Sequence, residues 1–222
     1  MERLEDANLQ TIKLYLKRML EINKSINLTA VRDYDKGLVL HVEDSLEGLG
    51  LARTLLEGRM ADIGSGCGFP GVALAVALQA PCDLIDSSTK KMKAVSSLLG
   101  DLGLGDLIAT HPARLEEYAL DNPSCYNLIT ARALASIRVV LELASPLLEL
   151  GGHLLLYKSS KVEEELAEAE PMADKVGMAF ASRKDVELSN GDPRSLVVFK
   201  KVHEPLVDLP RRVGKAQKSP LI

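Results

Sequence analysis

The chain has 222 residues, 46% of them hydrophobic, and a formal net charge of −4. This composition supports a globular protein with an ample core, and the negative charge argues against a nonspecific nucleic-acid coat, which is usually strongly basic. No apolar run approaches the roughly eighteen residues of a membrane span and no signal peptide is visible, so a cytoplasmic protein is expected. Its three cysteines lack Cys-x-x-Cys spacing, which predicts neither disulfides nor a metal site.

Two helices are predicted before the first strand. The first is amphipathic, with apolar residues at helical spacing: Leu9, Ile12, Leu16, Met19 and Leu20. A polar stretch over 23–30 interrupts this pattern, and a second helix is predicted over 35–46. We expect residues 1–58 to form a helical extension packed on a core domain of residues 59–222.

From residue 59 onward, short apolar runs alternate with helical patterns. Strands are predicted over 59–63, 82–86, 106–110, 126–130, 153–157, 178–187 and 195–201. Helices are predicted over 70–79, 89–102, 137–149 and 161–176, with a short one near Leu115. These units predict an α/β fold: a mostly parallel seven-stranded sheet, covered on both faces, with an antiparallel pair at the end.

The stretch from Asp62 to Gly71 reads Asp-Ile-Gly-Ser-Gly-Cys-Gly-Phe-Pro-Gly and predicts a strand, a tight loop and a helix. Its glycines permit positive φ and allow backbone N–H groups to approach a ligand closely. Asp62 ends an apolar strand, where a carboxylate needs a partner. The stretch therefore predicts a small-molecule cradle, although a sharp turn without a ligand is the alternative.

Spacing within this loop narrows the choice of ligand. No Lys-Ser/Thr pair follows Gly71, which disfavours a phosphate-binding P-loop, and Phe69 stands where a dinucleotide fingerprint needs its third glycine. Asp86 lies 22 residues after Gly64, where an acid can bind both hydroxyls of a ribose, and a helix-cap acid is the alternative. The Asp-x-Gly-x-Gly-x-Gly pattern resembles the first motif of Rossmann-like, class I SAM-dependent methyltransferases, which implies S-adenosyl-L-methionine as cofactor and S-adenosyl-L-homocysteine as product.

The turn after the fourth predicted strand restricts the chemistry. It reads Thr130-Ala131-Arg132-Ala133, without the Asn/Asp-Pro-Pro-Tyr/Phe sequence typical of methylation at an exocyclic amine. The nearest cysteine, Cys125, precedes the strand, so covalent catalysis at pyrimidine C5 is unsupported. A nucleophile with a free lone pair, such as guanine N7, needs neither device, because positioning suffices.

Several motifs together resemble one family. They are Asn23–Ala30, His41–Leu46, Asp62–Gly71, Arg132-Ala133 and Leu209–Arg212. In this order they resemble the RsmG/GidB family of bacterial 16S rRNA (guanine-N7) methyltransferases, which act in the 530 loop. The resemblance implies 16S ribosomal RNA or the small ribosomal subunit as partner, with no membrane and no metal, and a monomer is favoured.

The loop and the resemblance together predict the site residues. The cofactor-binding residues are Asp62, Gly64, Ser65, Gly66, Gly68, Phe69, Asp86, Leu115, Glu116 and Arg132. Arg132 is also the predicted catalytic residue, holding RNA phosphate or the target base, with a structural salt bridge as the alternative. The predicted RNA-binding residues are Lys24, Asn27, Lys158, Arg211, Arg212, Lys215 and Lys218. His41 and Asp44 are interpreted as a buried polar pair that locks the N-terminal helices on the sheet.

Two other functions remain open from the sequence. Asp86 and the alternating strands are also compatible with an NAD-dependent oxidoreductase, which titration with NAD and SAM would distinguish. A catalytically silent RNA-binding assembly protein would retain RNA affinity without methyl transfer.

Overall fold

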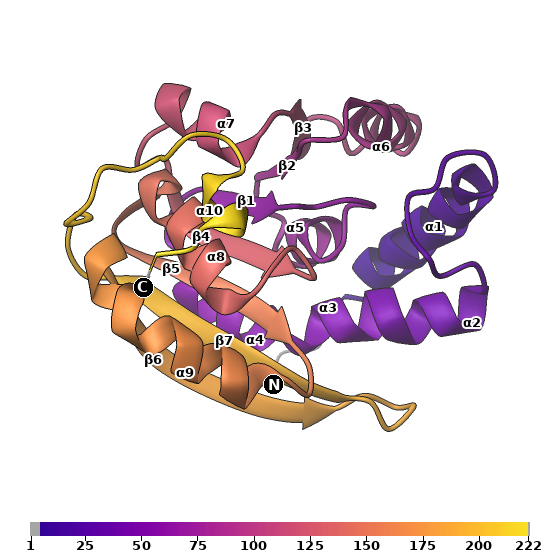
Figure 1. The fold of residues 1–222 in the computed structure, drawn as a ribbon. Helices are drawn as coiled ribbons and strands as arrows, with labels where there is room; N and C mark the ends of the chain where they lie inside the picture. The colour runs from indigo at the N-terminus through magenta and orange to yellow at the C-terminus, as the bar shows by residue number, and fades with distance from the viewer. Residues whose placement is uncertain (1–4, 222) are drawn as a thin grey trace.

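A computed structural model describes residues 5–221 and is built around one seven-stranded sheet in the order β3-β2-β1-β4-β5-β7-β6 (Figure 1). The strands are β1 Met60–Ile63, β2 Cys82–Asp86, β3 Ile108–Pro112, β4 Tyr126–Arg132, β5 Leu148–Lys158, β6 Met178–Glu187 and β7 Pro193–Lys201. Strands β1 to β5 pair in parallel, whereas β7 is antiparallel to both β5 and β6. The predicted sheet and its antiparallel pair are confirmed.

Helices cover both faces of the sheet. They are α1 Asp6–Asn23, α2 Tyr34–Gly37, the π-helix η1 Leu38–Glu43, α3 Asp44–Glu47, α4 Leu49–Leu55, α5 Gly71–Leu78, α6 Thr89–Asp101, α7 Leu115–Asp121, α8 Ile137–Ala144, η2 Ser145–Leu147, α9 Val162–Ala173, η3 Asp174–Val176 and α10 Lys215–Lys218. Helices up to α6 bury their apolar residues on one face, and the helices from α7 onward bury theirs on the other. Successive residues of each strand point to opposite faces, so each central strand contributes to both cores.

The strand order places the site. Because β2 and β4 lie on opposite sides of β1, the chain reverses direction across the sheet at the carboxyl end of β1. In open α/β sheets, this reversal leaves a crevice in which ligands bind. The glycine loop that joins β1 to α5 lies at this crevice.

The N-terminal helices are anchored on this loop. Ile12, Leu16 and Met19 of α1 are buried, and the Tyr15 hydroxyl donates to the Cys67 carbonyl over 2.8 Å. One apolar cluster includes residues both before and after residue 58. The division at residue 58 therefore stays a prediction, and residues 1–4 and 222 of the two ranges lie outside the described part of the chain.

The largest boundary differences from prediction are at the end of α8 and the start of β5. The helix predicted over 137–149 ends at Ala144, because Pro146 cannot continue the hydrogen-bond ladder and lies in a 3-10 turn. The strand predicted over 153–157 begins earlier, at Leu148, because Gly151 and Gly152 lie beside a β-bulge where the pairing of β4 and β5 shifts register and the strand continues through it. The helix predicted over 35–46 is confirmed in extent but contains a π-helical segment.

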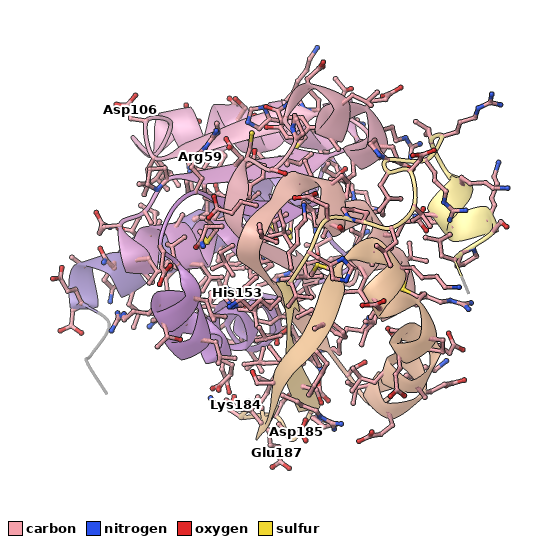
Figure 2. All side chains as sticks on the ribbon, turned by 90° about the vertical axis from the view of Figure 1, so that its left-hand side faces the viewer. Arg59, Asp106, His153, Lys184, Asp185 and Glu187 are labelled. Atoms are coloured by element: carbon pink, nitrogen blue, oxygen red, sulfur yellow. The ribbon has the colours of Figure 1, made fainter. Side chains whose placement is uncertain are left out.

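The outer edge strand, β6, carries charged side chains. Lys184, Asp185 and Glu187 lie near its end in Figure 2, and all three are exposed. Charges on an edge strand discourage pairing with a second sheet. Among residues 5–221, no helix has both the length and the apolar character needed to cross a membrane.

Candidate active site

The glycine loop adopts the backbone conformation that its sequence predicts. Gly64, Gly66 and Gly68 have φ of 65°, 53° and 93°, in the left-handed region that residues with a Cβ rarely adopt. The Gly64 and Ser65 amides both donate to the Ile85 carbonyl, over 2.8 and 3.3 Å. These contacts bind the start of the loop to the end of β2.

Asp62 anchors the loop through buried hydrogen bonds. Its carboxylate is fully buried and accepts hydrogen bonds from the Gly71 amide, over 3.0 Å, and from the Thr130 hydroxyl, over 2.8 Å. Burial raises the pKa of Asp62 to about 6, despite these hydrogen bonds. Asp62 thus connects β1, β4 and the start of α5.

Asp86 faces the first of two neighbouring cavities. One carboxylate oxygen accepts from the Gly66 amide over 3.0 Å and the other from the Ser88 amide over 2.8 Å. A carboxylate has about four acceptor positions, so Asp86 retains capacity for hydroxyl donors. The cavity measures about 70 Å³, and Gly64, Leu115 and Glu116 also line it.

This first cavity matches the adenosine portion of S-adenosylmethionine in chemistry. Its apolar walls come from Ile85, Leu115, Leu134 and Leu143, which suit a flat base, while Asp86 supplies the acid that suits a ribose. A Cβ on Gly64 would lie 2.6 Å from Leu134 Cδ1, so only glycine permits this close approach. The residues present therefore fit the nucleoside part of this cofactor.

A second, larger cavity of about 530 Å³ shares Leu134 with the first. Its charged and polar lining comes from four distant parts of the chain: His41, Asp44, Arg132, Lys158, Glu165 and Arg194. Three of these side chains are cations and two are carboxylates, which leaves an excess positive charge. The lining is therefore suited to an anionic or electron-rich ligand.

Arg132 is the centre of a hydrogen-bond network in this second cavity. Its Nη1 donates to the Leu40 carbonyl over 3.1 Å and to Asp44 Oδ2 over 3.0 Å. Its Nη2 lies 3.1 Å from His41 Nδ1 and 3.4 Å from the Phe69 carbonyl. Four of the five guanidinium N–H groups are thereby used within residues 5–221, which leaves the Nε–H for a ligand.

Asp44 joins two arginines. Its other carboxylate oxygen accepts from Arg194 Nε over 3.1 Å, and the residue is only 2% exposed. A buried carboxylate needs such partners to offset its lost hydration. Asp44 thus fixes Arg132 of β4 and Arg194 of β7 on the same side of the cavity.

His41 is neutral in this network. Arginine only donates, so His41 Nδ1 must accept from Arg132, and its Nε2 carries the proton toward the Thr29 hydroxyl, 3.1 Å away. Burial, and then the charge of Arg132, lower the pKa of His41 to about 4. The histidine connects the N-terminal helices to Arg132 and is not a base at neutral pH.

Lys158 fixes the segment between the two cavities. Its Nζ donates to the Ala135 carbonyl over 3.0 Å and lies 2.5 Å from Glu165 Oε2, which also accepts from the Ile137 amide over 2.8 Å. This segment includes Leu134, the residue common to both cavities. Lys158 therefore positions the wall between them.

Comparison with known families identifies the chain. The family model described as GidB, rRNA small subunit methyltransferase G, matches residues 8–189. A protein of Carboxydothermus hydrogenoformans named ribosomal RNA small subunit methyltransferase G is 34% identical, over 98% of this chain and 94% of its own length. Its namesake from Desulfitobacterium hafniense is 32% identical, over 99% and 92%. The chain belongs to this family.

Solved structures agree on the fold. An O-methyltransferase from Bacillus cereus in complex with SAH superposes with a TM-score of 0.63 at 15% identity, covering 85% of this chain and 91% of its own. A putative rRNA methylase from Clostridium thermocellum gives a TM-score of 0.55 at 17% identity, over 71% and 95%. At these identities the likeness establishes the class I methyltransferase fold, as predicted.

Within this family member, the predicted cofactor residues divide into two groups. Gly64, Asp86, Leu115 and Glu116 line the first cavity, and the Gly66 amide binds Asp86. The others do not line it. Asp62, Ser65, Gly68 and Phe69 lie in or behind the loop, and Arg132 lines the second cavity.

Phe69 and Gly68 support the loop from the N-terminal side. The Phe69 ring is buried and stacks on His41, with ring centroids 5.3 Å apart. A Cβ on Gly68 would lie 2.5 Å from the Tyr15 hydroxyl, so this glycine allows α1 to approach. Both residues therefore couple the loop to the N-terminal helices.

The predicted RNA-binding residues also differ in their surroundings. Lys24, Asn27, Arg212, Lys215 and Lys218 are exposed. Arg211 instead donates twice to the buried carboxylate of Glu142, over 2.7 and 2.6 Å. Sequence reasoning missed this pair, because no local pattern distinguishes an arginine that faces a buried acid from one that faces solvent.

Other site residues were also missed. Leu134, Arg194, Gly214 and Gln217 line the two cavities, yet no motif in the sequence indicated them. Asn23 was missed as the residue that shapes the following loop: its amide donates to the Thr29 and Val31 carbonyls, and its oxygen accepts two backbone amides. The signal available was its place at the end of an amphipathic helix, where asparagine commonly forms local bonds.

Proposed function

We propose that the chain transfers a methyl group from S-adenosyl-L-methionine to N7 of a guanine in the 530 loop of 16S ribosomal RNA. Membership of the family makes it a SAM-dependent rRNA methyltransferase. The full-length match is the observation that carries the proposal. The target atom and loop are its finer parts, and they rest on the family resemblance and on the chemistry of the second cavity.

The two cavities suggest a division of labour. The first would hold the adenosine portion of the cofactor against Gly64, Asp86 and Leu115. The second would hold the target nucleotide beside Arg132. Leu134 lines both, so the methyl group and the acceptor atom would meet beside it.

Methylation at N7 requires little acid–base chemistry. Guanine N7 has a lone pair and no proton, so no general base is needed, and the bound cofactor supplies an electrophilic methyl group. Arg132 would offer its Nε–H and its charge to the RNA while Asp44 and His41 hold the guanidinium in place. Asp44 and Glu165 would moderate the positive charge that the base acquires.

We also propose that the chain acts in the cytoplasm on ribosomal RNA or the small subunit. The exposed Lys24, Asn27, Arg212, Lys215 and Lys218 are its candidate phosphate-binding residues. Their role would be positioning, because phosphate contacts fix orientation without reading the base.

Methyl transfer from labelled SAM tests the proposal. Small subunits and free 16S RNA from cells lacking this activity are incubated with the protein, and the modified base is mapped. We expect label at N7 of one guanine in the 530 loop. Label on an exocyclic amine or a carbon would reject the N7 assignment, and binding of NAD in place of SAM would favour the oxidoreductase.

A further inference from the structure

The C-terminal segment, defined here as residues 209–219, lies against the cofactor cavity. Gly214 and Gln217 line the same cavity as Asp86, Leu115 and Glu116. In Figure 1 this segment, in yellow, returns across the molecule to place α10 beside α8, and the two helices are in contact. Residues remote in sequence from the glycine loop thus complete its cavity.

Specific contacts hold this segment in place. The Gly214 amide donates to Glu116 Oε1 over 2.7 Å, and Ala216 is buried in the core on the α8 side of the sheet. Arg211 pairs with Glu142, which is only 3% exposed, and also donates to the Ser219 carbonyl over 3.0 Å. The basic residues at this end are therefore part of an ordered wall.

The first cavity is small for a site that encloses a nucleoside. Sites that enclose drug-sized ligands measure about 300–1,000 Å³, whereas this cavity measures about 70 Å³. Its floor belongs to β2 and the glycine loop, which the sheet fixes. The C-terminal segment belongs to no strand, and the hydrogen bonds that hold it at Glu116 and Glu142 can break without disturbing the sheet, so we expect it to be the wall that moves when a nucleoside enters.

Gln217 has the chemistry to recognise the base. A carboxamide donates and accepts side by side, which matches the amino group and ring nitrogen of adenine. Gln217 lines the cavity together with Leu115, Glu116 and Asp86. Lys218, its neighbour on α10, does not line the cavity.

We propose that residues 209–219 form a closing wall of the cofactor site, in which Gln217 binds the adenine of the cofactor and the Gly214–Glu116 hydrogen bond holds the wall shut. This rests on the proposed function in one respect, that the cofactor carries adenosine. It assigns to Arg211 a structural role in the wall in place of an RNA contact.

The affinity for S-adenosylhomocysteine, measured without RNA, tests whether Gln217 contributes to cofactor binding. Calorimetry compares the wild type with Gln217→Ala and with the control Val213→Ala, an exposed position of the same segment that does not line the cavity. We expect about three- to tenfold weaker binding for Gln217→Ala, equivalent to one hydrogen bond, and wild-type binding for Val213→Ala. Thermal unfolding checks that both variants are folded.

Proteolysis gives a second measurement. Trypsin cleaves after Arg212, Lys215 and Lys218, so cleavage within the segment reports its opening. We expect saturating S-adenosylhomocysteine to slow this cleavage in the wild type. If Gln217→Ala bound S-adenosylhomocysteine as tightly as the wild type and the ligand did not slow cleavage, the closing wall would be contradicted while the proposed methyltransferase function stood. If the wild type did not bind S-adenosylhomocysteine at all, the proposed function itself would be contradicted.

Discussion

Arg132 combines two roles at the residue scale. It anchors Leu40, His41 and Asp44 of the N-terminal helices, and it lines the larger cavity with one N–H group left for a ligand. The structural salt bridge and the substrate contact, which the sequence presented as alternatives, are compatible in this geometry. A side chain whose rotamer is fixed by its neighbours loses less entropy when it binds substrate.

Replacing Arg132 by lysine should separate these roles from cofactor binding. Lysine keeps the charge but cannot reproduce the planar fork that reaches four acceptors. We expect methyl transfer to fall about ten- to hundredfold, the value of a hydrogen bond to a charged group, with the affinity for S-adenosylhomocysteine nearly unchanged. Arg183→Lys on the edge strand β6 is the control. Wild-type turnover by Arg132→Lys would show that Arg132 does not contribute to methyl transfer.

His41 should give the protein a distinct pH dependence. Its pKa is about 4 when folded and 6.5 ordinarily, so the unfolded chain binds more protons between these values and stability falls as the pH drops from 6.5 to 4. Asp62 acts in the opposite sense, because its pKa is raised from 3.8 to about 6 and its contribution to stability falls as the pH rises through that window. The two effects offset one another in the wild type.

The variant His41→Gln should therefore isolate the contribution of this histidine to the pH dependence of stability. We expect the difference in unfolding free energy between wild type and variant to grow in favour of the wild type by about 3 kcal/mol from pH 4 to 6.5. Urea unfolding across this range measures it. Asp62→Asn should give the opposite slope, and a difference that does not vary with pH for His41→Gln would mean that this histidine is not held neutral.

At the scale of elements, the glycine loop depends on support from every side. Asp62 holds it to β4 and α5, Tyr15 of α1 binds the Cys67 carbonyl, and Phe69 stacks on His41. These contacts fix the left-handed turns at Gly64, Gly66 and Gly68 in one arrangement. The second cavity is supported similarly, since Lys158 fixes the segment that carries Leu134.

Gly64→Ala and Gly103→Ala form a matched pair that tests the loop. Both glycines have a similar positive φ, 65° and 67°, so alanine at either position should cost about 1–2 kcal/mol of stability. Only the Cβ at Gly64 would collide with Leu134; that at Gly103 meets no atom within 4 Å. We expect S-adenosylhomocysteine binding to be lost by Gly64→Ala alone, and equal binding by the two variants would show that Leu134 moves freely.

On the scale of the whole molecule, the net charge of −4 conceals an uneven distribution. The second cavity has an excess of cations, and exposed Arg212, Lys215 and Lys218 lie on the C-terminal segment. Acidic residues elsewhere offset these cations in the total. Local charge, and not the sum, should therefore govern binding to RNA.

Salt dependence of RNA binding tests this distribution. We expect the double variant Arg212→Gln, Lys215→Gln to reduce the slope of log affinity against log salt by about 1.4–1.8, because two phosphate contacts no longer release counterions. The control, Lys184→Gln with Lys200→Gln, removes two exposed cations from the strands β6 and β7. If both double variants changed the slope equally, RNA binding would be a property of total charge.

The sequence by itself determined the elements and the class of ligand, because strand alternation, helical spacing and left-handed turns are local properties of the chain. Asp62, the three alternating glycines and Asp86 predicted the loop and its cofactor class. The strand predicted over 153–157 begins at Leu148 instead, because its first residues join the sheet through a register shift with β4 that only the pairing reveals. Only the tertiary structure decided which charges lose their water. Arg211 meets a buried acid on α8, Arg132 meets Asp44, and Gln217 lines the first cavity. Each of these contacts joins residues far apart in sequence, and its energy depends on burial that no local pattern encodes.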